Sequence, residues 1–89
     1  MLEIPFVEND RKYGYVFWSK DQDEGVKSFF SGLTSVKVWF GDSYVGEKRI
    51  DFKLRRIYVG MPQLRDVPGH TSAFILCFDT ASTLRIKPQ

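Results

Sequence analysis

The most regular alternation of apolar and polar residues in the chain runs from residue 35 to residue 40. Successive side chains of an extended strand point to opposite faces, so a period of two predicts a strand with one buried face and one outer face. One face carries aliphatic residues and a phenylalanine, and the other carries a lysine and a tryptophan. The first set is Val36, Val38 and Phe40, and the second is Lys37 and Trp39.

A tight turn directly follows this strand. The Gly41–Asp42 pair is typical of a two-residue hairpin loop. The returning strand would then place Trp39 opposite Tyr44 and Val38 opposite Val45. Both pairs would be favourable cross-strand contacts, so we expect a β-hairpin here.

The alternation continues through residues 48–59, but its phase changes. Apolar residues are even-numbered up to Leu54 and odd-numbered from Ile57 onward. Either a tight turn at Lys53–Leu54 or a bulge near Arg55 would bring both halves back onto one face. The turn predicts three cross-strand pairs: Ile50 with Ile57, Asp51 with Arg56, and Arg49 with Tyr58.

The pattern of residues 19–33 predicts a helix. Ser19 or Asp21 can accept hydrogen bonds from the free N–H groups of a first helical turn, and Gln22 or Glu24 three residues later completes a capping box. An apolar stripe with helical spacing follows and ends at Ser31–Gly32. Its members are Val26, Phe29, Phe30 and Leu33. We expect this helix to pack its phenylalanines onto a sheet.

Four further segments complete the pattern. Tyr13–Ser19 is aromatic and β-branched, which predicts a strand that is apolar on both faces, and therefore a central or covered strand and not a solvated edge. Met61–Ser72 contains two prolines and a glycine, which indicates an exposed loop. Ala73–Phe78 predicts a strand buried on both sides, and Thr83–Lys87 predicts a last edge strand.

Together these elements predict an α+β fold: a small, mostly antiparallel sheet of about five to six strands with one amphipathic helix packed on it. The chain has no internal repeat and no linker-like run of Gly, Ser or Pro. Of its 89 residues, 43% are hydrophobic, which is enough apolar material for one core. We therefore expect a single domain over residues 1–89.

Cysteine content and hydropathy indicate the cellular compartment in which the protein is expected. Cys77 is the one cysteine, so no internal disulfide can form, and it lies in an apolar run where a thiol behaves as a small hydrophobe. The first residues lack the basic and apolar regions of a secretion signal. No apolar run approaches the roughly 18 residues that cross a bilayer. These features indicate a cytoplasmic protein with no membrane partner.

Signatures of enzymes are absent from the sequence. A zinc site needs about four ligands with local spacing, which one histidine, His70, and Cys77 do not supply. No Gly-rich phosphate loop or dinucleotide fingerprint is present. The acids Asp21, Asp23 and Glu24 suit the positive end of a helix dipole better than a cation site. We therefore expect a noncatalytic protein without a cofactor or a metal.

Positive charge is concentrated in the second half of the chain. Residues 1–47 carry five Lys or Arg and eight Asp or Glu, whereas residues 48–89 carry eight and three. Five of the basic residues lie in segment 48–58 among apolar ones, and on strands alternate positions would form a cationic strip beside aromatic rings. Such a surface contacts phosphates and stacks on unpaired bases of DNA or RNA. The candidate nucleic-acid-binding residues are Lys37, Trp39, Tyr44, Arg49, Lys53, Arg55, Arg56 and Tyr58.

Two other interpretations stay open. Lys and Arg on a strand edge also prevent aggregation, and Asp51 can pair with Arg56 within the hairpin. Two apolar sheet faces with one helix to cover them would suit a homodimer or another protein partner. The glycine-containing aromatic segment Tyr13–Phe17, with the basic aromatic hairpin, resembles sheet-surface nucleic-acid binders such as RNA-recognition motifs and cold-shock domains. Neither family's defining motif is present, so no family is assigned.

Overall fold

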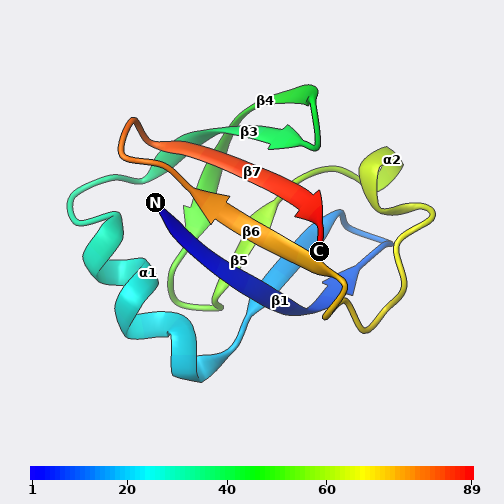
Figure 1. The fold of residues 1–89 in the computed structure, drawn as a ribbon, viewed down its shortest axis with the longest axis horizontal. Helices are drawn as coiled ribbons and strands as arrows, with labels where there is room; N and C mark the ends of the chain where they lie inside the picture. The colour runs from blue at the N-terminus through cyan, green and yellow to red at the C-terminus, as the bar shows by residue number, and fades with distance from the viewer.

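Strands with one apolar face are stable only when that face is buried, and here seven such strands curl into a closed barrel (Figure 1). The computed structural model describes all 89 residues. The strands are β1 (Leu2–Asp10), β2 (Tyr15–Trp18), β3 (Ser35–Phe40), β4 (Ser43–Asp51), β5 (Arg56–Tyr58), β6 (Phe74–Phe78) and β7 (Thr83–Pro88). They follow the order β1–β2–β5–β4–β3–β7–β6 around the barrel, and β6 pairs with β1 to complete the circle. Only β3 and β7 are parallel neighbours.

This barrel corrects the predicted fold class. An α+β sheet of about five to six strands with a helix packed on it is wrong, because seven strands close on one another. The predicted edge strand, β7, is an interior strand between β6 and β3. The first strand, β1, was not predicted at all.

The sequence pattern of strand β1 is interrupted by Pro5, a residue that is typical of the end of a strand. Pro5 is the last residue of β1 that pairs with β6, and pairing with β2 begins at Phe6. The proline thus lies where the strand changes partners, one of the few strand positions that tolerate it. On either side, Ile4 and Phe6 point into the core with almost no exposure.

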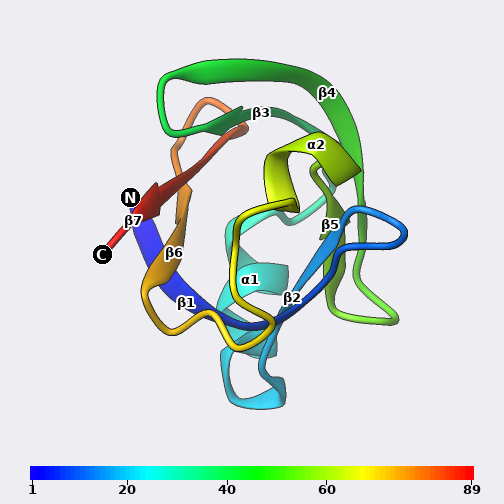
Figure 2. The same cartoon turned by 90° about the vertical axis from the view of Figure 1, so that its right-hand side faces the viewer.

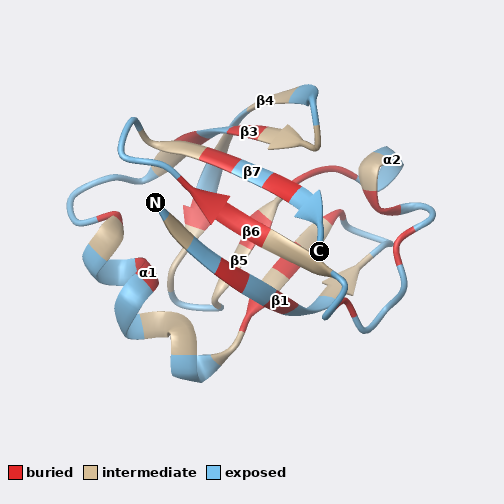
Figure 3. Cartoon of the chain, in the orientation of Figure 1, coloured by how far each residue is buried: buried red, intermediate tan, exposed pale blue.

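The barrel interior and both of its ends share one core of 17 buried residues. Figure 3 shows the buried and exposed positions alternating along β1 and β7. Helices α1 (Asp23–Phe29) and α2 (Met61–Leu64) lie at opposite ends of the barrel, on the left and on the right of Figure 1, and Figure 2 looks along the barrel from the α2 end. Val26 and Phe30 fill one end, and Leu64 and Val67 fill the other.

The helical segment is therefore an end plug and does not cover a sheet face. It begins with a short 3-10 turn, η1 (Lys20–Gln22), and continues as α1. The predicted capping box is wrong, because no side chain caps either segment. The apolar stripe is confirmed at Val26 and Phe30, which are buried, but Leu33 is exposed. Phe30 stacks edge-on against Phe78 of β6, with 4.8 Å between the ring centroids.

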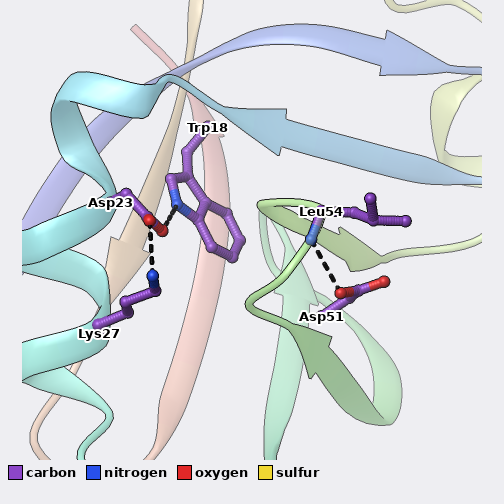
Figure 4. A network of polar contacts seen from close by, with 5 residues as sticks. All are labelled: Trp18, Asp23, Lys27, Asp51 and Leu54. Carbon is purple, nitrogen blue, oxygen red and sulfur yellow. Dashed lines mark hydrogen bonds and ion pairs between the residues drawn. The ribbon is translucent and has the colours of Figure 1, made fainter.

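A single carboxylate ties α1 to the barrel (Figure 4). Buried Trp18 donates its indole N–H to Asp23 Oδ1 at 3.2 Å, and Lys27 Nζ lies 2.9 Å from Asp23 Oδ2. Partial burial of Asp23 opposes its ionisation. The hydrogen bonds from Lys27 and Trp18, with the charges of Lys27 and Arg55, outweigh that effect and hold the pKa of Asp23 below that of an ordinary aspartate.

The first predicted hairpin is confirmed with one change of register. Trp39 lies opposite Tyr44, as predicted, across the Gly41–Asp42 turn. Val38, however, lies opposite Gly46, so the predicted pair of Val38 with Val45 is wrong. A β-bulge at this point inserts one extra residue into β4, and Gly46 takes the positive φ of 110° there.

Segment 61–72 is only partly the exposed loop that was predicted. It contains α2 and three buried side chains, Leu64, Val67 and Thr71. Thr71 donates its hydroxyl to the carbonyl oxygen of Phe6 at 2.9 Å. This bond satisfies a buried hydroxyl and ties the segment to β1. None of the helices is long and apolar enough to cross a membrane.

Two glycines bring distant parts of the backbone into contact. The carbonyl oxygen of Gly14 accepts hydrogen bonds from the N–H groups of Val59 (2.8 Å) and Gly60 (3.0 Å). Gly14 has φ of +82°, and a Cβ atom on it would lie 2.8 Å from the backbone of Gly60. Both the conformation and the spacing therefore require glycine at position 14.

We expect Gly14→Ala to lower the free energy of unfolding by about 2–4 kcal/mol, because the methyl group would push the two backbones apart. Gly25→Ala is the matched control. Gly25 lies in α1 with open space around it, so alanine there should stabilise by up to about 1 kcal/mol. Urea denaturation measures both. A Gly14→Ala protein as stable as wild type would contradict the close contact.

The lowered pKa of Asp23 predicts a pH-dependent contribution to stability. The carboxylate stabilises the fold above the ordinary aspartate pKa, and that contribution is lost as the pH falls through the lower pKa of the folded state. Asp23→Asn retains an acceptor for Trp18 but loses the charge, so it should cost about 1 kcal/mol at about pH 7. Urea denaturation at neutral and acidic pH should show this difference shrinking below about pH 4. A difference independent of pH would argue against the ionised contact.

Candidate functional site

The basic hairpin formed by β4 and β5 projects cations from the barrel. Ile50 lies opposite Ile57 with both side chains buried, and Asp51 lies opposite Arg56. The turn predicted at Lys53–Leu54 is therefore confirmed, and with it two of the three predicted pairs. The ladder ends before the third pair. Since residues alternate along a strand, the neighbours of these isoleucines face outward.

Asp51 stabilises the turn between β4 and β5, which contains neither Gly nor Asn. Its Oδ1 accepts a hydrogen bond from the backbone N–H of Leu54 at 3.0 Å (Figure 4), and its Oδ2 lies 3.2 Å from Arg56 Nε. An aspartate that bonds the backbone three residues on stabilises a turn without Gly or Asn. Arg55 then takes a positive φ of 53° to rejoin β5, a conformation more common in glycine.

Two tyrosines lie beside this hairpin on the outer face of the barrel. Tyr15 of β2 pairs with Tyr58 of β5, and their rings meet edge-on at 5.6 Å. Arg56 lies over the Tyr15 ring at 4.0 Å, and Lys48 lies over the Tyr58 ring at 4.7 Å. These cation–π contacts restrict two long side chains. Strand β2 is central, between β1 and β5, which is one of the two alternatives predicted for this segment. Its outer face is not fully covered, because Tyr15 is only half-buried.

A groove of about 580 Å³ opens between these side chains. We call this surface the β4–β5 groove; its lining includes Tyr15, Lys48, Arg49, Lys53 and Tyr58. Two carboxylates, Glu47 and Asp51, also line it.

Most of the cationic charge of the groove has no carboxylate partner. The structure contains three ion pairs, and only the pair between Arg56 and Asp51 lies at this surface. Lys48, Arg49 and Lys53 therefore form none. The other carboxylate, Glu47, accepts a hydrogen bond from Ser35 Oγ at 3.3 Å. The groove thus keeps a net positive charge that an anion could neutralise.

A second aromatic cluster lies at the opposite end of β4. Trp39 and Tyr44 face each other across the hairpin, with 5.0 Å between their ring centroids. On the other side of Trp39, the Arg85 guanidinium lies 5.3 Å from its ring centroid. We call Tyr44, Trp39 and Arg85 the hairpin cluster.

The structure divides the eight predicted residues into separate groups. Three of them, Arg49, Lys53 and Tyr58, line the β4–β5 groove. Arg56 lies beside the groove, over the Tyr15 ring. Trp39 and Tyr44 belong to the hairpin cluster, and Lys37 lies opposite Glu47 between the two groups. Arg55 stands apart, because its charge acts on Asp23 and its Nε is buried without a partner.

Three residues of these clusters were missed by the sequence prediction. Alternation with buried Val16 could have placed Tyr15 on the outer face. Lys48 shares the even numbering of the buried Ile50, so alternation places it inward, yet its long side chain reaches Tyr58. No local signal places Arg85 beside Trp39, because that contact depends on the parallel pairing of β7 with β3.

The remaining chemically active groups do not form a second site. Burial raises the pKa of the Cys77 thiol, and nearby Glu3 adds to this rise against the opposing charge of Lys87. A raised pKa keeps the thiol protonated and unreactive. His70 lies on an exposed loop. No group of three or more His, Cys, Asp or Glu side chains is placed to hold a metal ion.

Comparisons with known proteins returned no matching family model, no similar curated protein and no similar solved structure. A function for this surface must therefore follow from its own charges, rings and shape.

We expect two substitutions of Asp51 to separate its roles in the hairpin. Asp51→Asn keeps an oxygen for the Leu54 N–H and loses the ion pair, which contributes at most about 1 kcal/mol at a partly exposed site. Asp51→Ala loses both contacts and should cost about 1–2 kcal/mol. Urea denaturation gives both values. Equal losses would show that the ion pair, and not the turn, holds the hairpin.

Proposed function

We propose that this chain is a noncatalytic module that binds DNA or RNA through its phosphate backbone at the β4–β5 groove. The observation that supports this most is the set of cations without carboxylate partners, Lys48, Arg49 and Lys53, around one groove. Cations crowded together repel one another, and a polyanion relieves that repulsion while releasing its own counterions.

The two tyrosines position the charges. Because Lys48 rests on Tyr58 and Arg56 rests on Tyr15, these side chains lose less freedom on binding than free surface lysines and arginines would. Arg56 is further oriented by Asp51. A guanidinium plane held in this way can also carry a stacked base on its free side.

The alternative of a homodimer or another protein partner loses its main argument. It depended on apolar sheet faces left uncovered by a single helix, and the closed barrel turns those faces inward. The large apolar residues that remain exposed are distributed over different elements and include Val7, Leu33, Leu54 and Met61. Single exposed apolar side chains are ordinary on protein surfaces.

Salt titration of binding to oligothymidylate and to a random duplex tests the proposal. The logarithm of the affinity should fall linearly with the logarithm of the salt concentration. Arg49→Ala/Lys53→Ala should weaken binding and make the slope for single strands shallower by about 1.4, since each lost phosphate contact accounts for about 0.7. Circular dichroism should show an unchanged fold, because both side chains are exposed.

Lys12→Ala/Lys20→Ala is the matched control for charge. It also removes two exposed cations, but from the β1–β2 turn and from η1. Its slope should equal that of the wild type. If both double variants lose affinity equally, the groove has no special role, and undetectable binding by the wild type at low salt would refute the proposal.

A further inference from the structure

The hairpin cluster forms one row across three neighbouring strands. Trp39 of β3 is paired with Tyr44 of β4 on one side and with Arg85 of β7 on the other. Figure 1 shows these three strands side by side. Neighbours in register project from the same face of a sheet, so the row stands on the outer surface of the barrel. It presents two aromatic rings and a guanidinium together.

Tyr44 is the exposed member of this row. Its exposed fraction is 56%, whereas Trp39 is half-buried between its two neighbours. The rings of Tyr44 and Trp39 are tilted by 55° to each other, so their planes do not stack. The tyrosine ring therefore keeps surface on which another flat group can lie.

Strand β4 connects the row to the β4–β5 groove. Figure 2 shows β4 as one continuous bent strand that runs from the β3 hairpin to the side of β5. Tyr44 and Arg49 lie on its outer face, opposite Trp39 and Ser35 of β3. Five residues of strand span at most about 17 Å. A stacked nucleic-acid strand advances about 3.4 Å per nucleotide, so about five nucleotides would reach from one cluster to the other.

We propose that the hairpin cluster is a base-stacking platform and that the natural ligand class is single-stranded nucleic acid. In this arrangement an unpaired base lies on the ring of Tyr44, and Trp39 packs against that tyrosine. Arg85 contacts the phosphate next to the stacked base. This inference rests on the proposed function, because the groove holds the backbone of the same strand. A duplex cannot use the platform, since its bases are already stacked on one another.

Substitution of Tyr44 tests the platform separately from the groove. Tyr44→Ala should weaken binding of oligothymidylate by roughly 5- to 150-fold, the range for loss of one stacked base. Duplex binding and the salt slope should not change, because no cation is removed. Tyr44→Phe keeps the ring and should bind like the wild type.

Tyr13→Ala is the matched control. Tyr13 is 57% exposed, close to the 56% of Tyr44, but it lies at the β1–β2 turn, where Lys12 is over its ring. Its loss should leave the affinity unchanged. The fluorescence of Trp39 gives a second measurement, because oligothymidylate stacked beside it should quench the emission. The other tryptophan, Trp18, is buried and should not respond.

The outcomes distinguish the two proposals. If Tyr44→Ala binds single strands like the wild type while Arg49→Ala/Lys53→Ala is weakened, the platform is refuted and the groove stands. Equal loss of single-strand and duplex affinity in Tyr44→Ala would also refute the platform. If the wild type binds neither probe, the proposed function itself fails.

Discussion

The parallel pairing of β3 with β7 is the constraint on which the rest of the structure depends. It joins Lys37–Phe40 to Thr83–Ile86 and closes a sheet in which every other neighbouring pair is antiparallel. With the circle complete, no strand has an open edge that could pair with another chain. The apolar faces of all seven strands then meet in one interior, which α1 and segment 61–72 seal at the ends.

Closure of the barrel also determines which charged and aromatic side chains meet on its outer surface. Arg85 reaches Trp39 only because β7 lies beside β3, and Tyr15 reaches Tyr58 only because β2 lies beside β5. In both clusters an aromatic ring holds a cation in place on a rigid strand. Side chains fixed in this way lose little entropy on binding, which is the basis of a preorganised site. The surface is thus a product of the barrel and not of any one hairpin.

Local patterns in the sequence predicted local structure well. Strand β3, the Gly41–Asp42 turn, the pairing of Trp39 with Tyr44 and the turn at Lys53–Leu54 all follow from alternation and turn chemistry within about ten residues. The bulge at Gly46 does not follow from these patterns, because a glycine inside a strand pattern does not indicate which of the two strands contains an extra residue.

Long-range pairing was not predictable in the same way. A run such as Thr83–Lys87 has the same alternation whether it lies at an edge or between two strands. Pro5 interrupts the strand pattern of β1, but the barrel tolerates a proline where that strand changes partners. For the candidate site, alternation found Arg49, Arg56 and Tyr58. It could not show that Arg55, one residue away, has a buried Nε and acts through its charge on Asp23 of α1.

The position of β7 has a consequence for the order of folding. During synthesis both local hairpins can form early, but the gap between β3 and β6 stays open until residues 83–88 have left the ribosome. Until then those two strands offer unpaired backbone groups to other nascent chains. Contacts between residues so distant in the chain form slowly, so the unpaired edges of β3 and β6 are open to aggregation until β7 is in place.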